Sequence, residues 1–141
     1  MNWMTYVLGA AAALAAADVF VKLAAGKVPN SLGMLLYGAV AFGVGAIWTV
    51  LDRTAGEPVR ASTAGIAYAL AVGVSFSAVT FGLYSAFTAG APLSVTSPVV
   101  RLGGLIVASV CGVLIWHEPV TFRYATGVTL ALVGVYLIAT R

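Results

Sequence analysis

The sequence predicts an all-α integral membrane protein, a bundle of five transmembrane helices that forms a single domain over residues 1–141. Hydrophobic residues make up 62% of the chain and charged residues only 8%, whereas a soluble domain carries about 25% charged residues. The apolar residues also form continuous stretches that are long enough for a helix to cross about 30 Å of hydrocarbon. There are five such stretches, at about residues 3–23, 32–51, 63–87, 98–116 and 122–140.

The first three stretches are separated by connections that contain turn-forming or polar residues. Residues 3–23 are interpreted as a retained helix, because no Lys or Arg precedes them and the apolar run is too long for a signal peptide. Gly26 and Pro29 then favour a turn before residues 32–51. The longest and most polar connection precedes residues 63–87.

The fourth stretch follows a connection that is only weakly polar, and it has a clear predicted helix start. Ser97 is a favourable N-cap residue, and Pro98 suits the first helical position, so the fourth helix is predicted to begin there. Pro119 marks a tight turn before residues 122–140. The short connections leave no room for a soluble domain.

Asp18 is a carboxylate inside the first apolar stretch. A charged residue there costs up to about 3 kcal/mol, and intramembrane ionisable groups usually face a cavity or a partner. Lys22 follows at i+4 on the same helix face. Two interpretations are open: a self-neutralising pair of Asp18 and Lys22 near the interface, or a site in which these residues bind a proton or a cation.

Other polar residues are candidates for the lining of a substrate path. Arg101 is expected in the first turn of the fourth helix, either as an anchor to headgroup phosphate or as a cation that meets an anionic substrate group. Ser77, Thr80 and Tyr84 share one face of the third stretch. Their hydroxyl groups either line a path or, as is common in membrane helices, bond within the protein.

Small residues recur at helix-packing spacing in the last two stretches. Such faces allow close approach of helix backbones in a membrane, either within one chain or between two copies. The residues concerned are Gly104, Ala108 and Gly112 in the fourth stretch and Gly127, Ala131 and Gly134 in the fifth.

Several functional classes are not expected. With one His and one Cys in the chain, no cluster of metal ligands is formed. No catalytic set of nucleophile, His and carboxylate can be assembled, so an enzyme is not expected, and no cofactor is predicted. The net charge of +3 is spread over short loops. Basic residues in such positions usually orient the helices in a membrane and do not indicate nucleic-acid binding.

Three segments near the C-terminus carry a family resemblance. They read S-V-T-S-P-V-V-R-L from Ser94, H-E-P-V-T from His117 and G-V-T-L-A-L-V-G-V-Y-L-I-A from Gly127. This pattern resembles the EamA domain of the drug/metabolite transporter superfamily, in particular its five-helix, single-domain branch. Tyr84 in Y-S-A-F and Lys22 in D-V-F-V-K-L also match positions of that domain.

The chain departs from the family pattern at two places. His117 replaces the usual glycine before Glu118, and Ala15–Ala16 stand where many members have Trp-Gly. In the related small multidrug resistance proteins, the register of the functional glutamate falls on Leu14, so Asp18 lies one turn later.

The resemblance implies one repeat of a transporter that is normally built from two. Most members contain two inverted copies, so this chain is expected to pair with an inverted copy as an antiparallel homodimer of dual topology. In inverted-repeat transporters the substrate site lies between the halves, which rock against one another to give alternating access.

The charges that orient the helices are nearly balanced, as dual insertion requires. If Asp18 cancels Lys22, three basic residues remain on each side. The N-terminal side carries Arg53, Arg60 and Arg123, and the opposite side carries Lys22, Lys27, Arg101 and Arg141.

We therefore expect a multi-pass protein of the cell (inner) membrane, in contact with the lipid bilayer. The leading functional hypothesis is a secondary-transporter subunit that exports a small organic metabolite or cation, with proton coupling through Asp18 as a compatible mechanism. One alternative is a carrier of lipids or lipid-linked sugars, in which Arg101 contacts phosphate. Another is a non-transporting assembly partner of a different membrane protein.

Overall fold

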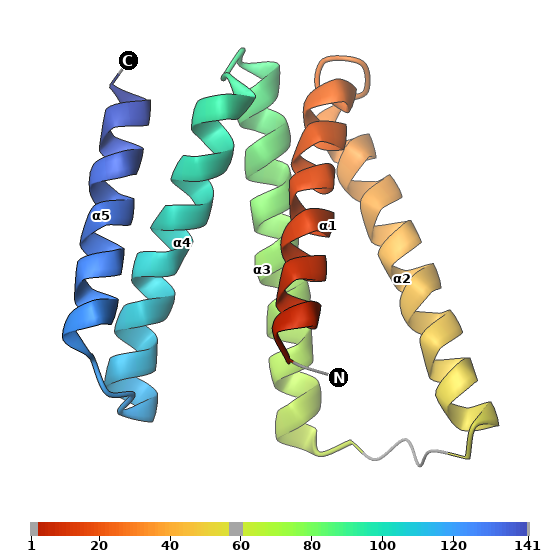
Figure 1. The fold of residues 1–141 in the computed structure, drawn as a ribbon. Helices are drawn as coiled ribbons and strands as arrows, with labels where there is room; N and C mark the ends of the chain where they lie inside the picture. The colour runs from red at the N-terminus through yellow and green to blue at the C-terminus, as the bar shows by residue number, and fades with distance from the viewer. Residues whose placement is uncertain (1–2, 57–60, 141) are drawn as a thin grey trace. The chain divides into compact units, whose positions relative to one another are not determined.

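The computed structural model describes residues 3–56 and 61–140, and in this part of the chain the secondary structure is helical. An isolated β-bridge joins Ala25 to Val28, and no strand occurs among the described residues. Arg60 and Arg141, which enter the charge count, lie outside the described residues. The described ranges contain five helices (Figure 1): α1 (Trp3–Ala24), α2 (Asn30–Thr54), α3 (Thr63–Thr88), α4 (Leu93–Trp116) and α5 (Phe122–Ala139).

Each helix is long and apolar enough to cross a membrane. The large hydrophobic side chains along them are mostly exposed, as in Phe42 at 80% and Phe122 at 88% of their possible surface. A soluble protein would not leave contiguous apolar faces of this extent in water. The prediction of five apolar helices and of a multi-pass membrane protein is confirmed at this level.

The predicted start of the fourth helix is wrong. The helix begins at Leu93, directly after Pro92, and therefore contains Ser97 and Pro98. Ser97 is not an N-cap residue, and Pro98 lies within the helix, where its ring cannot donate the usual backbone hydrogen bond. Arg101 consequently lies eight residues after the first helical residue, more than two turns from the helix start.

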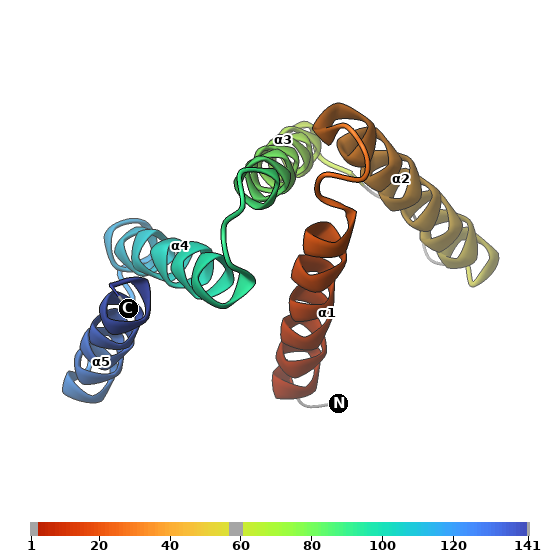
Figure 2. The same cartoon turned by 90° about the horizontal axis from the view of Figure 1, so that it is seen from above.

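The chain divides into two compact units. Unit 1 contains Met1–Asp18 and Gly90–Arg141, and unit 2 contains Val19–Ala89, so that α1 contributes residues to both. In unit 1, α4 and α5 lie side by side (Figures 1 and 2). The hydroxyl groups of Ser109 on α4 and Tyr124 on α5 are hydrogen-bonded to each other and join the two helices.

The core of unit 2 lies near the start of α2 and the end of α3. Its buried hydrophobic residues are Leu83, Tyr84 and Phe87, all on α3. The Tyr84 ring packs directly against Gly33 of α2, where a Cβ atom would lie 2.6 Å from Cζ of the ring. Beside this contact, Asn30 Nδ2 donates a hydrogen bond to Ser85 Oγ at 3.3 Å, which holds the two helices together.

A candidate ion-pair site in unit 1

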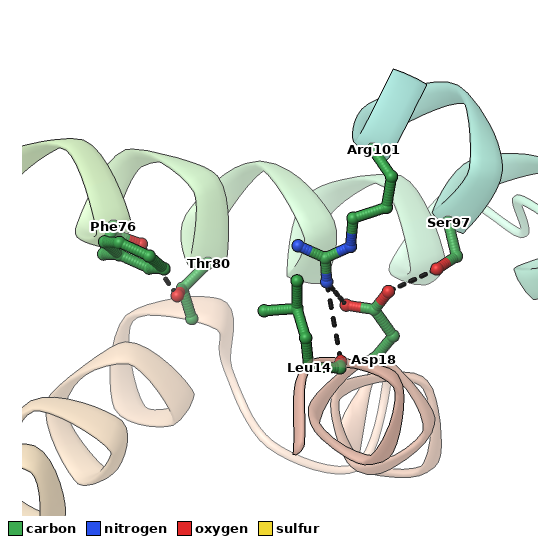
Figure 3. Close-up of polar contacts among 6 residues, drawn as sticks. All are labelled: Leu14, Asp18, Phe76, Thr80, Ser97 and Arg101. Atoms are coloured by element: carbon green, nitrogen blue, oxygen red, sulfur yellow. Dashed lines mark hydrogen bonds and ion pairs between the residues drawn. The ribbon is translucent and has the colours of Figure 1, made fainter. Parts of the chain in front are cut away.

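Asp18 of α1 and Arg101 of α4 form an ion pair (Figure 3). Arg101 Nη2 lies 2.6 Å from Asp18 Oδ1. The Ser97 hydroxyl group donates a hydrogen bond to the other carboxylate oxygen, Oδ2. Arg101 Nη2 also makes a long contact of 3.5 Å with the backbone carbonyl oxygen of Leu14. The site therefore joins a buried carboxylate, a guanidinium group and a hydroxyl group.

Helical periodicity explains why these groups meet. Ser97 and Arg101 are four residues apart on α4, so they share one face of that helix. Leu14 and Asp18 have the same spacing on α1, which brings the Leu14 carbonyl group and the Asp18 side chain to one face. Two faces, one from each helix, thus supply all four groups of the site.

The carboxylate is almost completely enclosed, whereas the guanidinium group is not. The exposed fraction is 3% for the Asp18 side chain and 31% for the Arg101 side chain. An ionised carboxylate withdrawn from water is stable only if it is paired and hydrogen-bonded. Removal of Arg101 would leave this enclosed charge without compensation, a change that typically costs about 3–5 kcal/mol.

The counter-charge of Asp18 differs from the one expected in the self-neutralising interpretation. That interpretation assigned the role to Lys22, but the ion pair in unit 1 is with Arg101. The Lys22 ammonium group lies 5.2 Å from the centre of the Phe87 ring in unit 2, a cation–π geometry. The expectation that Arg101 lies in the first turn of its helix is also wrong.

One signal in the sequence could have identified the pair. Asp18 and Arg101 are charges of opposite sign inside apolar segments, and such charges tend to pair with one another. The misplaced helix start hid this signal, since it put Arg101 at the end of a helix, where contact with lipid headgroups was an adequate explanation.

The residues predicted to line a path on α3 belong to unit 2. The Thr80 hydroxyl group donates to the Phe76 carbonyl oxygen at 2.8 Å (Figure 3), as hydroxyl groups in membrane helices often do. Tyr84 is buried against Gly33, and Ser77 is half-buried. Thr80 and Tyr84 thus have packing or hydrogen-bonding roles within unit 2, and a role in lining a path stays a prediction.

The small residues of α4 and α5 differ in their surroundings. A Cβ atom added at Gly104, Gly127 or Gly134 would meet nothing within 4 Å beyond its own helix. At Gly112, by contrast, it would lie 2.8 Å from Oε2 of Glu118. Ala108 is exposed and Ala131 is half-buried. The absence of a side chain at Gly112 therefore allows the Glu118 carboxylate to lie close to the helix backbone. For the other small residues, a role in a dimer interface stays a prediction.

Among residues 3–56 and 61–140, no group of three or more His, Cys, Asp or Glu side chains could hold a metal ion. Comparison of the chain with protein-family models, with curated proteins and with solved structures found no match.

Proposed function

We propose that the chain is a subunit of a secondary transporter that exports a small organic metabolite or cation, and that the Asp18–Arg101 pair is its functional site. The observation that carries this proposal is a 97%-enclosed carboxylate side chain, paired with arginine between helices that are apolar enough to cross a membrane. Ionisable residues within membrane segments commonly mark ion or substrate pathways.

The pair can couple transport to a proton gradient. In the ionised state, Asp18 holds Arg101 Nη2 at 2.6 Å. A proton on the Asp18 carboxylate removes the negative charge that attracts the guanidinium group, so Arg101 is then held only by weaker contacts. Protonation and release of Arg101 are therefore linked, and the energy of a proton gradient can drive a change in what Arg101 binds.

We further propose that two copies assemble with inverted orientation, as the resemblance to the EamA domain implies. The charge balance supports this arrangement. Because Arg101 is paired with Asp18, these two charges cancel, and Arg101 no longer counts as an orienting charge. Three basic residues then remain on either side, which gives little preference for one orientation in the inner membrane.

The experiment that tests this function measures flux in reconstituted proteoliposomes. A panel of small organic cations, amino acids and organic acids is screened with and without an imposed pH gradient. We expect wild-type protein to accelerate the flux of at least one compound in a manner that depends on the gradient. Failure to accelerate any of them would count against the proposal.

Asp18→Asn and Asp52→Asn form a matched pair of variants for this assay. The substitution is the same, but Asp52 is exposed in the last turn of α2. We expect Asp18→Asn to abolish gradient-driven flux and Asp52→Asn to retain it. Equal gradient-driven flux in the two variants would remove Asp18 from the mechanism.

A further inference from the structure

The hydrogen bonds of the Asp18–Arg101 pair are unequally distributed. Both oxygens of Asp18 are engaged, Oδ1 by Arg101 and Oδ2 by Ser97. On Arg101, in contrast, the hydrogen bonds start from Nη2 alone. The N–H groups of Nε and Nη1 have no hydrogen-bond partner in the described part of the chain.

These open donors are accessible. The Arg101 side chain is 31% exposed, and no buried side-chain nitrogen or oxygen atom among the described residues lacks a partner. Nε and Nη1 of Arg101 are therefore not buried within the protein. In an apolar segment, unsatisfied donors of a charged group strongly favour an acceptor.

The chemistry of the open donors selects the ligand. A cation has little access to Asp18, because this side chain is only 3% exposed and already contacts Arg101 and Ser97. An oxyanion needs to displace neither residue. The planar guanidinium group matches carboxylate and phosphate oxygens, and such charge-assisted hydrogen bonds are among the strongest in proteins.

We propose that Arg101 binds an oxyanion of the substrate, a carboxylate or a phosphate, through Nε and Nη1, while its Nη2 remains oriented by Asp18. The inference rests on the proposed transport function and narrows the substrate to metabolites that carry an acidic group. Asp18 is then a positioning residue that aims the guanidinium group, and Ser97 fixes the carboxylate.

Binding can be measured without transport. Protein in maltoside micelles is titrated calorimetrically with inorganic phosphate, with acetate and with tetramethylammonium, at constant ionic strength. We expect saturable binding of at least one oxyanion and none of tetramethylammonium. Saturable binding of the cation alone would overturn the inference.

Arg101→Lys and Arg123→Lys provide the matched comparison. Lysine keeps the positive charge that Asp18 requires but lacks the planar array of donors, and Arg123 is exposed near the start of α5. We expect oxyanion affinity to fall at least tenfold in Arg101→Lys and to stay unchanged in Arg123→Lys. Equal affinities in these two variants would contradict the proposal.

A second measurement does not depend on the fold of Arg101→Lys. In a chain whose other arginines are replaced by lysine, the Arg101 Nε–H group gives a single ¹⁵N resonance. We expect this resonance to shift in a saturable manner with phosphate or acetate. A resonance that stays unmoved at concentrations that saturate the calorimetric signal would place the oxyanion elsewhere.

Two sources of the oxyanion can be separated in the same assay. Dioctanoyl phosphatidic acid that binds at least tenfold more tightly than inorganic phosphate would indicate a lipid headgroup, whereas similar affinities would indicate a water-soluble metabolite. Oxyanion binding without any flux would sustain this inference and contradict the transport proposal. Flux of a cation without oxyanion binding would do the reverse.

Discussion

Arg101 Nη2 lies 2.6 Å from Oδ1 of Asp18, although the two residues are 83 positions apart in the sequence. Each of these charges would be costly in an apolar segment by itself. Together they form a neutral pair whose carboxylate is enclosed and whose guanidinium group retains open donors. The proposed oxyanion site depends on this asymmetry between the two partners.

The contact between Gly33 and Tyr84 predicts a strong sensitivity to a single methyl group. In Gly33→Ala, the new Cβ atom would lie 2.6 Å from Cζ of Tyr84, so the ring or the helix must move. We expect the free energy of unfolding in mixed micelles to fall by about 1–3 kcal/mol. The double variant Gly33→Ala/Tyr84→Leu should recover part of this loss, because leucine lacks the distal ring atoms.

Gly38→Ala is the control for that experiment. A Cβ atom at Gly38 meets nothing within 4 Å, and alanine is favoured over glycine within a helix. We expect no loss of stability at this position. If Gly33→Ala were as stable as Gly38→Ala, the close packing of α2 on α3 at Tyr84 would be incorrect.

The end of α4 predicts a stabilising substitution. His117 adopts a left-handed conformation, with φ 52°, which only glycine adopts without a steric penalty. His117→Gly should be more stable to unfolding than His117→Ala by about 1 kcal/mol. The opposite order would contradict the assigned backbone conformation.

The open glycines of α4 and α5 predict a separation between folding and self-association. Gly104→Leu and Gly127→Leu add side chains into space that is empty within the chain, so the helical content should be unchanged. If these residues form a dimer interface, we expect dimer dissociation constants, measured by energy transfer between labelled chains, to rise at least about tenfold. Dimerisation as strong as in Gly38→Leu would exclude the interface.

The charge balance predicts a response of membrane orientation to one residue. Paired reporters fused after Arg141, one active only inside the cell and one only outside, should both give a signal for the wild-type chain. Lys27→Gln removes an orienting charge from the side that carries the C-terminus. The ratio of the two reporter signals should therefore shift toward the orientation in which Arg53 and Arg123 lie inside the cell. A single unchanged orientation in both proteins would exclude dual topology.

Helix number and most helix ends could be predicted from the sequence, because continuous apolar runs are a strong signal for membrane helices. The ends of α1, α3 and α5 agree within one residue with expectation, and α2 is longer at both ends. The start of α4 could not be placed, because Ser97 and Pro98 form a plausible helix start whether or not the helix continues before them. The helix in fact begins at Leu93, so the capping preference of Ser97 and the N-terminal preference of Pro98 did not determine where it starts.

The candidate site could be predicted only in part. The sequence marks Asp18 and Arg101 as unusual, but their pairing depends on where α1 and α4 approach one another within unit 1, which spacing along the chain does not specify. The i+4 relation to Lys22 offered a local partner, whereas the ion pair that forms is long-range. The hydrogen bond from Ser97 to Asp18 was not predicted, because an N-cap side chain is expected to bond to the backbone of its own helix.

The role of the ion pair in transport is tested by measuring both stability and gradient-driven flux in the double variant Asp18→Asn/Arg101→Gln, beside each single variant. Removal of both charges leaves no unpaired ion, so the double variant should be more stable than Arg101→Gln, in which the enclosed carboxylate loses its counter-charge at a cost of about 3–5 kcal/mol. If the pair performs transport, gradient-driven flux stays abolished although stability is recovered. Flux that returns together with stability would show that the pair serves the fold alone and would contradict its proposed role in transport.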